Sequence, residues 1–328
     1  MKEVAGREVG MDCSRAVCAL YIVGFWHLSE YIGIDIWNSV TYQATHGVLA
    51  TFTFISGYFL GKKKVESIKE IFLFYMKRLA GFYPLFIVAC ILLYRIGCIK
   101  DSRQLVLTTF GLSCFVPPAP MTAWYLCMLM NFYFITPIIN SYATRKARWL
   151  IIAATELLLI VTVAYGNADM RLCFYWPFYS AGLLSSTKIL VNKVNFKAIL
   201  SAVIIFLGVS INIGNGIGIF SFITSGCIVV FMLNVGQILK NTVLHRSMML
   251  ISYASMCAYL FHRPIYSLAS GYLGGAILTA YGMMLPALLM LCCGIQFLYD
   301  KLIKSRFDIR IERMYGSNNE RTAKGFNR

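Results

Sequence analysis

The stretch MDCSRAVCALYIVGFWHLSEY (residues 11–31) decides the fold class, because an apolar run of this length can cross a bilayer as one helix. It also carries ionisable residues, which are costly in hydrocarbon: Arg15 near its start, His27 deep inside it and Glu30 three residues later. Ionisable side chains at such a depth normally face the interior of a helical bundle. This stretch therefore predicts a membrane protein with a polar site among its helices.

The rest of the chain has the same apolar character. Of its 328 residues, 59% are hydrophobic and 13% are charged, and the mean hydropathy is +0.68. These values exclude a water-soluble domain and predict an all-α, polytopic membrane helical bundle with about ten transmembrane helices. We place the spans at 13–34, 46–61, 80–97, 122–142, 149–166, 172–187, 197–213, 217–238, 249–269 and 275–299.

The net charge of +16 has a different meaning here from its meaning in a soluble protein, where it would suggest nucleic acid. With the N-terminus in the cytoplasm, most Lys and Arg residues fall in the inner loops and at the inner helix ends. This distribution follows the positive-inside rule. We therefore expect both termini in the cytoplasm and no nucleic-acid partner.

The chain is predicted to form one unit, with residues 1–300 as a single integral-membrane domain and residues 301–328 as a basic, partly disordered cytoplasmic tail. Segment 62–84 has the helical spacing of an amphipathic surface helix. Segment 105–120 is too short to cross a bilayer and is interpreted as re-entrant or interfacial. The 11 cysteines are scattered without a C-x-x-C pair, so no metal is expected.

His27 is the leading candidate for chemistry. A histidine in hydrocarbon is favoured in its neutral form, which can accept a proton from a hydroxyl group. Glu30 lies close to the same helix face and is predicted to orient or charge-stabilise the ring. Asp12, about 22 Å away along the helix, is a weaker candidate at the cytoplasmic end. The alternative for His27 is a structural hydrogen bond across the bundle.

Other ionisable residues inside the spans are candidates as well. His46 lies at the outer start of the second span and is expected to approach the site of His27. His262 and Arg263 precede a proline in mid-span, and are either functional or a structural pair in a kinked helix. Glu156 is a carboxylate in the middle of an apolar span, where a partner such as Arg263 would neutralise it.

Basic and aromatic residues near the span ends add two further groups of candidates. Arg15, Lys77 and Arg78 lie where anionic groups could be bound from the cytoplasm, although the positive-inside rule alone also explains Lys77 and Arg78. Aromatic residues at span ends either line a sugar-binding surface or form interfacial belts. The aromatic candidates are Trp26, Trp124, Tyr125 and Trp176.

Six segments together resemble the acyltransferase-3 family of integral-membrane acyltransferases. They occur in the family's order. They are DCSRAVCALYIVGFWHL (12–28), FTFISGYFL (52–60), YMKRLAGFYPL (75–85), AWYLCMLMNFYFITPII (123–139), WPFYSAGLL (176–184) and SYASMCAYLFHRPI (252–265). The resemblance implies O-acylation of surface glycans or small glycosides, with a coenzyme A donor bound from the cytoplasm.

The resemblance also assigns roles to residues. It implies that Arg15 and His27 are essential, with His27 as the catalytic base, and that Lys77 and Arg78 bind the donor. The family usually places ten residues between this Arg and this His, whereas here eleven intervene, so an α-helix would place the two side chains about 120° apart. A one-residue π-bulge near Gly24 would restore their alignment. Otherwise Arg15 acts separately at the cytoplasmic mouth.

We therefore expect a bacterial inner-membrane O-acyltransferase that uses acetyl-CoA as co-substrate and acetylates a hydroxyl of a cell-surface glycan or its lipid-linked precursor. The expected partners are the lipid bilayer, an acyl-CoA and the glycan acceptor, and a homo-oligomer is left open. One alternative is a membrane carrier for a lipid-linked sugar or small solute, although the paired repeats of many carriers are not visible. The other is an inactive relative with an assembly or sensing role.

Overall fold

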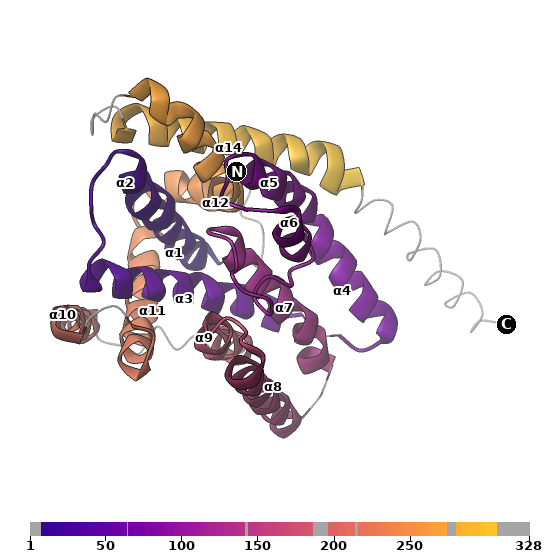
Figure 1. The fold of residues 1–328 in the computed structure, drawn as a ribbon. Helices are drawn as coiled ribbons and strands as arrows, with labels where there is room; N and C mark the ends of the chain where they lie inside the picture. Colours follow the sequence, from indigo (N-terminus) through magenta and orange to yellow (C-terminus); the bar gives the residue numbers. More distant parts are fainter. Residues whose placement is uncertain are drawn as a thin grey trace.

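The described chain forms a bundle of helices without β-strands, which confirms the predicted all-α class (Figure 1). The computed structural model describes residues 8–63, 65–141, 144–185, 196–213, 216–273 and 280–306. Most of the predicted cytoplasmic tail, from residue 307 onward, lies outside these ranges.

The helices occupy the positions of the predicted spans. Six of them are long and apolar enough to cross a membrane, and the count of about ten stays a prediction. In chain order they are α1 (Val9–Ala19), η1 (Leu20–His27), α2 (Leu28–Tyr31), α3 (Ser39–Gly61), α4 (Ile68–Ala80), α5 (Tyr83–Arg95), α6 (Ser102–Thr109), α7 (Ala123–Ser141), α8 (Arg145–Gly166), α9 (Arg171–Ser185), α10 (Phe196–Ile213), α11 (Ile219–Leu239), α12 (His245–Leu273), η3 (Ala280–Met284), α14 (Leu285–Tyr299) and η4 (Asp300–Lys304).

Two segments were expected to differ from simple spans. Segment 62–84 forms α4, whose first residue, Ile68, is 85% exposed. After a two-residue break, however, α4 is followed by α5, so that Ile68–Arg95 is long and apolar enough to cross a membrane as one unit. Segment 105–120 contains the end of the short helix α6 and then irregular chain, which fits a segment that does not cross.

Helix α3 lies at the centre of the bundle, in contact with α1, α7, α9, α10 and α11. Its closest neighbour is α9, because glycines on both helices let the two backbones approach. A Cβ at Gly57 would collide with the Tyr179 carbonyl, and one at Gly182 would collide with the Phe54 carbonyl. This close crossing fixes α3, which carries several residues of the candidate site.

Replacing Gly57 with alanine is expected to lower the thermal unfolding temperature strongly, because the new methyl group meets rigid backbone rather than a flexible side chain. Gly208→Ala is the matched control, since a Cβ at Gly208 has nothing within 4 Å and alanine favours a helix over glycine. Both variants would be heated in detergent micelles and their unfolding followed by circular dichroism. Equal unfolding temperatures would show that the α3–α9 crossing relaxes easily.

Candidate active site

The first helix changes geometry on its way to His27. It is α-helical over Val9–Ala19, π-helical over Leu20–His27 and α-helical again from Leu28. A π-helical segment accommodates extra residues relative to an α-helix and is frequent at functional sites. A π-bulge near Gly24 was one of the two alternatives for the extra residue, and the structure has a π-helical segment there, which ends at His27. The His27 residue is only 8% exposed.

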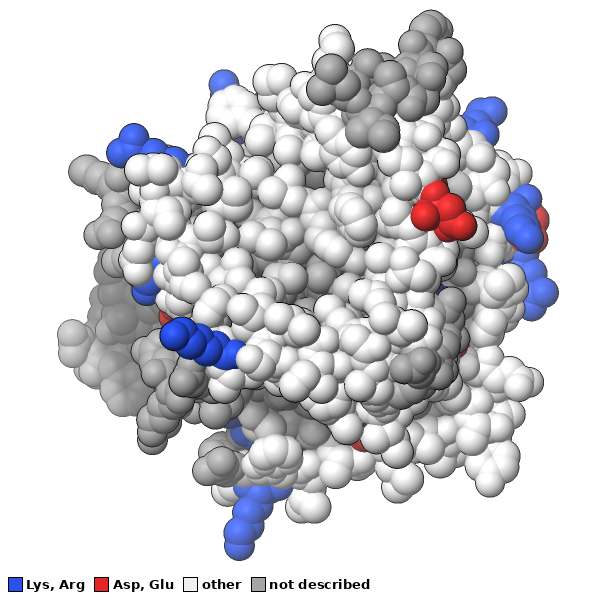
Figure 2. Space-filling model, turned by 90° about the vertical axis from the view of Figure 1, so that its left-hand side faces the viewer, with Lys and Arg blue, Asp and Glu red and all other residues white. Residues whose placement is uncertain are grey.

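His27 lines a cavity of about 300 Å³. The cavity lies at the end of the bundle that carries the α2–α3 connection, from which Trp37 contributes. Figure 2 looks onto this side of the molecule, where charged side chains are found mainly toward the edge. His46 lines the same cavity, which confirms the predicted approach of the two histidines. The His46 Nδ1 atom is 2.7 Å from the Tyr175 hydroxyl.

Aromatic side chains form much of the cavity wall. Trp26 packs against Trp37 with ring centroids 4.6 Å apart, and Trp124 also lines the cavity. Of the four aromatic candidates, Trp26 and Trp124 therefore line the cavity. Tyr125 and Trp176 do not line the cavity. They are 4% and 1% exposed, because their polar atoms are used by hydrogen bonds inside the bundle.

Part of the wall was not predicted from the sequence. Trp37 and Tyr42 flank the start of α3, and Tyr259 comes from α12. Trp37 stands just after the first span, where an aromatic residue is more often read as part of an interfacial belt. The folded α2–α3 connection instead turns it back onto Trp26.

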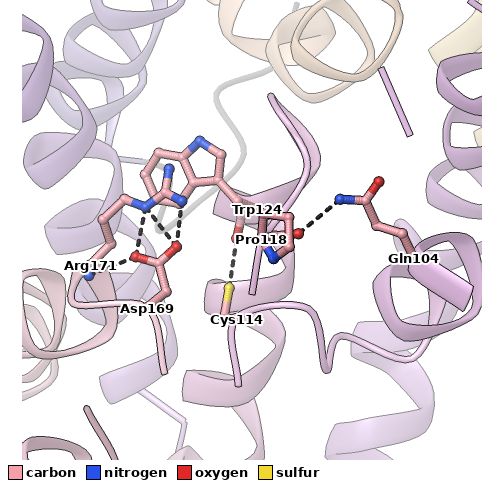
Figure 3. A network of polar contacts seen from close by, with 6 residues as sticks. All are labelled: Gln104, Cys114, Pro118, Trp124, Asp169 and Arg171. Atoms are coloured by element: carbon pink, nitrogen blue, oxygen red, sulfur yellow. Dashed lines mark hydrogen bonds and ion pairs between the residues drawn. The ribbon is translucent and has the colours of Figure 1, made fainter. Parts of the chain in front are cut away.

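An ion pair completes the polar side of the cavity. The guanidinium of Arg171 donates from Nε and Nη2 to the carboxylate of Asp169 and lies 4.0 Å from the ring centroid of Trp124 (Figure 3). The Asp169 amide donates to the Cys114 carbonyl at 2.8 Å, which ties this turn to the segment before α7. Asp169 and Arg171 were not among the predicted site residues. Their close spacing in the sequence, at the start of a helix, is the signal that could have identified them as an ion pair.

Arg263 links three segments beside the cavity. Its guanidinium donates to both carboxylate oxygens of Glu30 at 2.9 and 3.2 Å, and its Nε donates to the Thr122 hydroxyl at 2.6 Å. The Thr122 carbonyl accepts a hydrogen bond from Tyr259 at 2.9 Å, and Thr122 has φ 67°, a strained value for a β-branched residue. Arg263 thus holds a cavity-lining residue in place.

This ion pair corrects two predictions. Glu30 was expected to orient His27, but its carboxylate is bound by Arg263, and no hydrogen bond joins it to His27 in the described structure. Glu156 was given Arg263 as a partner, but Glu156 lies on α8, and its buried Oε2 atom has no hydrogen-bond partner among the described residues. The ion pair across α2 and α12 forms because those helices pack together.

His262 stands next to His27. The two rings are nearly parallel, with an interplanar angle of 14° and centroids 4.5 Å apart. His262 is fully buried and does not line the cavity itself. The structure therefore places His262 behind His27, as seen from the cavity.

The predicted donor residues lie away from this cavity. Arg15 has its guanidinium 5.2 Å from the Phe59 ring centroid and 3.6 Å from the Asp12 carboxylate, so Arg15 and His27 do not share the cavity. Asp12 also accepts a hydrogen bond from a serine of α12.

Arg78 and Lys77 occupy the last turn of α4. Arg78 donates to the Tyr133 hydroxyl at 2.7 Å, and its guanidinium lies 4.4 Å from that ring centroid. Lys77 is exposed. The predicted donor residues therefore lie apart from the cavity, with Arg15 beside Phe59 of α3 and Arg78 against Tyr133 of α7.

Comparison with known proteins then identifies the family. A family model described as an acyltransferase domain matches residues 8–298, which is most of the chain. The chain belongs to the acyltransferase-3 family. No curated protein and no solved structure was found to match it. Membership of the acyltransferase-3 family, together with the apolar helices, indicates a membrane acyltransferase and favours this class over a carrier.

For an acyltransferase-3 protein, the cavity offers groups suited to acyl transfer. A neutral imidazole can take a proton from a hydroxyl group, and His27 is an imidazole that lines the cavity. Aromatic walls and a paired Asp169 and Arg171 provide apolar faces and hydrogen-bonding groups for a bound hydroxyl compound.

Proposed function

We propose that this protein transfers an acetyl group from acetyl-CoA to a hydroxyl of a cell-surface glycan or its lipid-linked precursor, in the bacterial inner membrane. The observation that carries the proposal is the placement of a buried histidine, His27, on an aromatic-walled cavity in a chain of the acyltransferase-3 family. Both termini lie in the cytoplasm in this proposal, which places the cavity toward the outer side.

The cavity suits a sugar because a sugar ring has apolar faces and a rim of hydroxyl groups. Trp26, Trp37 and Trp124 present flat apolar surfaces. His46 and the Asp169–Arg171 pair present hydrogen-bonding atoms. Such a combination of apolar walls and a few fixed polar groups is typical of ligand pockets.

The reaction is a direct acyl transfer. His27 accepts the proton of the acceptor hydroxyl through one ring nitrogen while the hydroxyl oxygen attacks the thioester carbonyl carbon. The carbon–sulfur bond then breaks, and the departing thiolate takes the proton back from the His27 imidazolium. The products are the acetyl ester and free coenzyme A, so His27 returns to its neutral form.

In this proposal the donor binds from the cytoplasm at Arg78, Lys77 and Arg15. Arg78 supports this role because its guanidinium is held by Tyr133, and a fixed guanidinium binds phosphate with directed hydrogen bonds. Arg15 and His27 are separated along the first helix by somewhat less than the roughly 18 Å of twelve α-helical residues, because the segment before His27 is π-helical. The extended pantetheine arm of the donor would have to cover that distance within the bundle.

Arg78→Ala is expected to raise the KM for acetyl-CoA by about 10–100-fold, the equivalent of losing a charge-assisted hydrogen bond of about 1.5–3 kcal/mol. Lys77→Ala should have a smaller effect, because an exposed ammonium is screened by water and salt. Initial rates at varied acetyl-CoA concentration measure both. Tyr133→Phe, which removes the hydroxyl but keeps the ring, is the control for the positioning of Arg78. An unchanged KM in Arg78→Ala would remove Arg78 from the donor site.

The proposal is tested by giving acetyl-labelled acetyl-CoA to inside-out membrane vesicles from a glycan-producing host. Vesicles with the protein are compared with vesicles from an empty-vector strain, and label is followed into the glycan fraction. We expect label only when the protein is present. Equal label in both preparations, with folded protein confirmed, would contradict the proposal and favour the carrier alternative.

A further inference from the structure

His27 and His262 form a stacked pair of imidazoles in the interior of the bundle. Their ring centroids are 4.5 Å apart, one ring coming from the end of η1 and the other from α12. The proposed mechanism uses His27 but gives no role to His262. Ionisable side chains in the interior of a membrane bundle are rare and commonly mark functional sites.

Hydrogen bonds fix the tautomer of His262. Its Nδ1 atom lies 3.1 Å from the Ala258 carbonyl oxygen and 2.8 Å from that of Tyr259. Carbonyl oxygens only accept hydrogen bonds, so His262 Nδ1 carries the proton and its Nε2 atom is an acceptor. That Nε2 atom is buried and has no hydrogen-bond partner in the described part of the chain.

His27, the other ring of the pair, also has one nitrogen without a hydrogen bond. Its Nδ1 atom is buried and has no hydrogen-bond partner among the described residues. The ring lines the cavity, so Nε2 is the nitrogen left for a bound hydroxyl. A general base is normally oriented by a third group that accepts a hydrogen bond from its other nitrogen. The nearby carboxylate, Glu30, is bound by Arg263, so it does not serve as the orienting group for His27.

We infer that His262 is the positioning residue for His27: the His27 Nδ1–H donates to His262 Nε2, which leaves the His27 Nε2 lone pair directed at the cavity. In the present geometry the two rings are nearly parallel, so the in-plane N–H of His27 does not point at the in-plane lone pair of His262. The bond requires the His27 ring to turn about its Cβ–Cγ bond when substrate binds. The inference rests on the proposed function of His27. It replaces the carboxylate of a typical catalytic triad with a neutral imidazole whose tautomer is set by backbone carbonyls.

The first test compares acetyl transfer in vesicles carrying His262→Phe, His262→Gln and His245→Ala. His262→Phe keeps a flat ring for stacking but lacks the acceptor, so kcat should fall about 10–100-fold, the size of effect seen for orienting partners in metal sites. The KM for acetyl-CoA should stay the same. Glutamine restores an acceptor near the position of Nε2 and should recover part of kcat. His245, at the start of α12, bonds to the Thr242 carbonyl and serves as the matched control.

The second test does not depend on activity. The chain contains four histidines, so ¹⁵N-histidine NMR of the purified full-length protein in nanodiscs can be assigned by single substitutions. With coenzyme A bound, we expect the His27 proton on Nδ1 in the wild type and a mixture of tautomers in His262→Phe. An unchanged His27 tautomer in His262→Phe would overturn the inference, even if transfer is lost, because the loss would then be structural.

The two tests separate the inference from the proposed function. If wild-type vesicles transfer no acetyl group, the proposed function fails, while the NMR comparison still decides whether His262 sets the His27 tautomer. If wild-type vesicles are active and His262→Phe has the wild-type kcat, the inference fails and the proposed function stands.

Discussion

Vesicles carrying His27→Ala are expected to lose acetyl transfer by at least about 100-fold, because positioned general bases typically contribute 10²–10⁴-fold. The side chain lines the cavity, and its neighbour Glu30 cannot replace it because Arg263 binds both carboxylate oxygens. His46 lines the same cavity but directs its Nδ1 to the hydroxyl of Tyr175. The measurement is transfer of label from acetyl-CoA to the glycan fraction, normalised to the amount of folded protein.

Two further variants make this result specific. His27→Gln keeps a polar side chain of similar length but cannot act as a base near neutral pH, and should be as inactive as His27→Ala. His46→Ala removes the second histidine of the cavity and should change the KM for the acceptor more than kcat. Full transfer by His27→Ala, with protein levels matched, would contradict its role as the base.

The second large effect concerns stability. Arg263→Met is expected to lower the free energy of unfolding by about 3 kcal/mol, near the lower end for removing one partner of a buried ion pair, because the Glu30 side chain keeps 26% exposure. The loss also frees Thr122, whose strained backbone is held by Arg263 Nε and by Tyr259. Denaturant titration in detergent micelles measures the change.

A double variant shows how much of this loss comes from the uncompensated Glu30 charge. Arg263→Met with Glu30→Gln removes both charges and should recover more than half of the lost stability. Arg263→Lys keeps the charge but cannot bind both carboxylate oxygens at once, so its stability should lie between wild type and Arg263→Met. If the double variant is as unstable as Arg263→Met, the ion pair is not the cause, and packing of the long Arg263 side chain is the explanation.

The sequence was sufficient for properties that depend on local composition. Long apolar runs predicted the positions of the helices, because burial of apolar side chains in lipid depends on the residues of each run. The extra residue between Arg15 and His27 raised a π-bulge as one of two alternatives, because helical geometry has a fixed number of residues per turn, and the structure has a π-helical segment there. His27 was recognisable for the same reason, since a histidine in an apolar run is costly whatever its neighbours are.

The tertiary structure decided which residues meet. From the sequence we expected Glu30 to interact with His27, and Arg263 with Glu156. In the structure α2 packs against α12, and this packing joins Glu30 to Arg263 instead. The same packing places His262 behind His27.

The wall of the cavity was decided in the same way. Tyr125 and Trp176 turn inward, while Trp37 and the Asp169–Arg171 pair reach the cavity from segments far apart in the chain. The physical reason is that hydropathy is a property of one segment, while an ion pair, a stacked pair or a cavity wall depends on the distance between segments. The distances between segments are set only when the helices pack together.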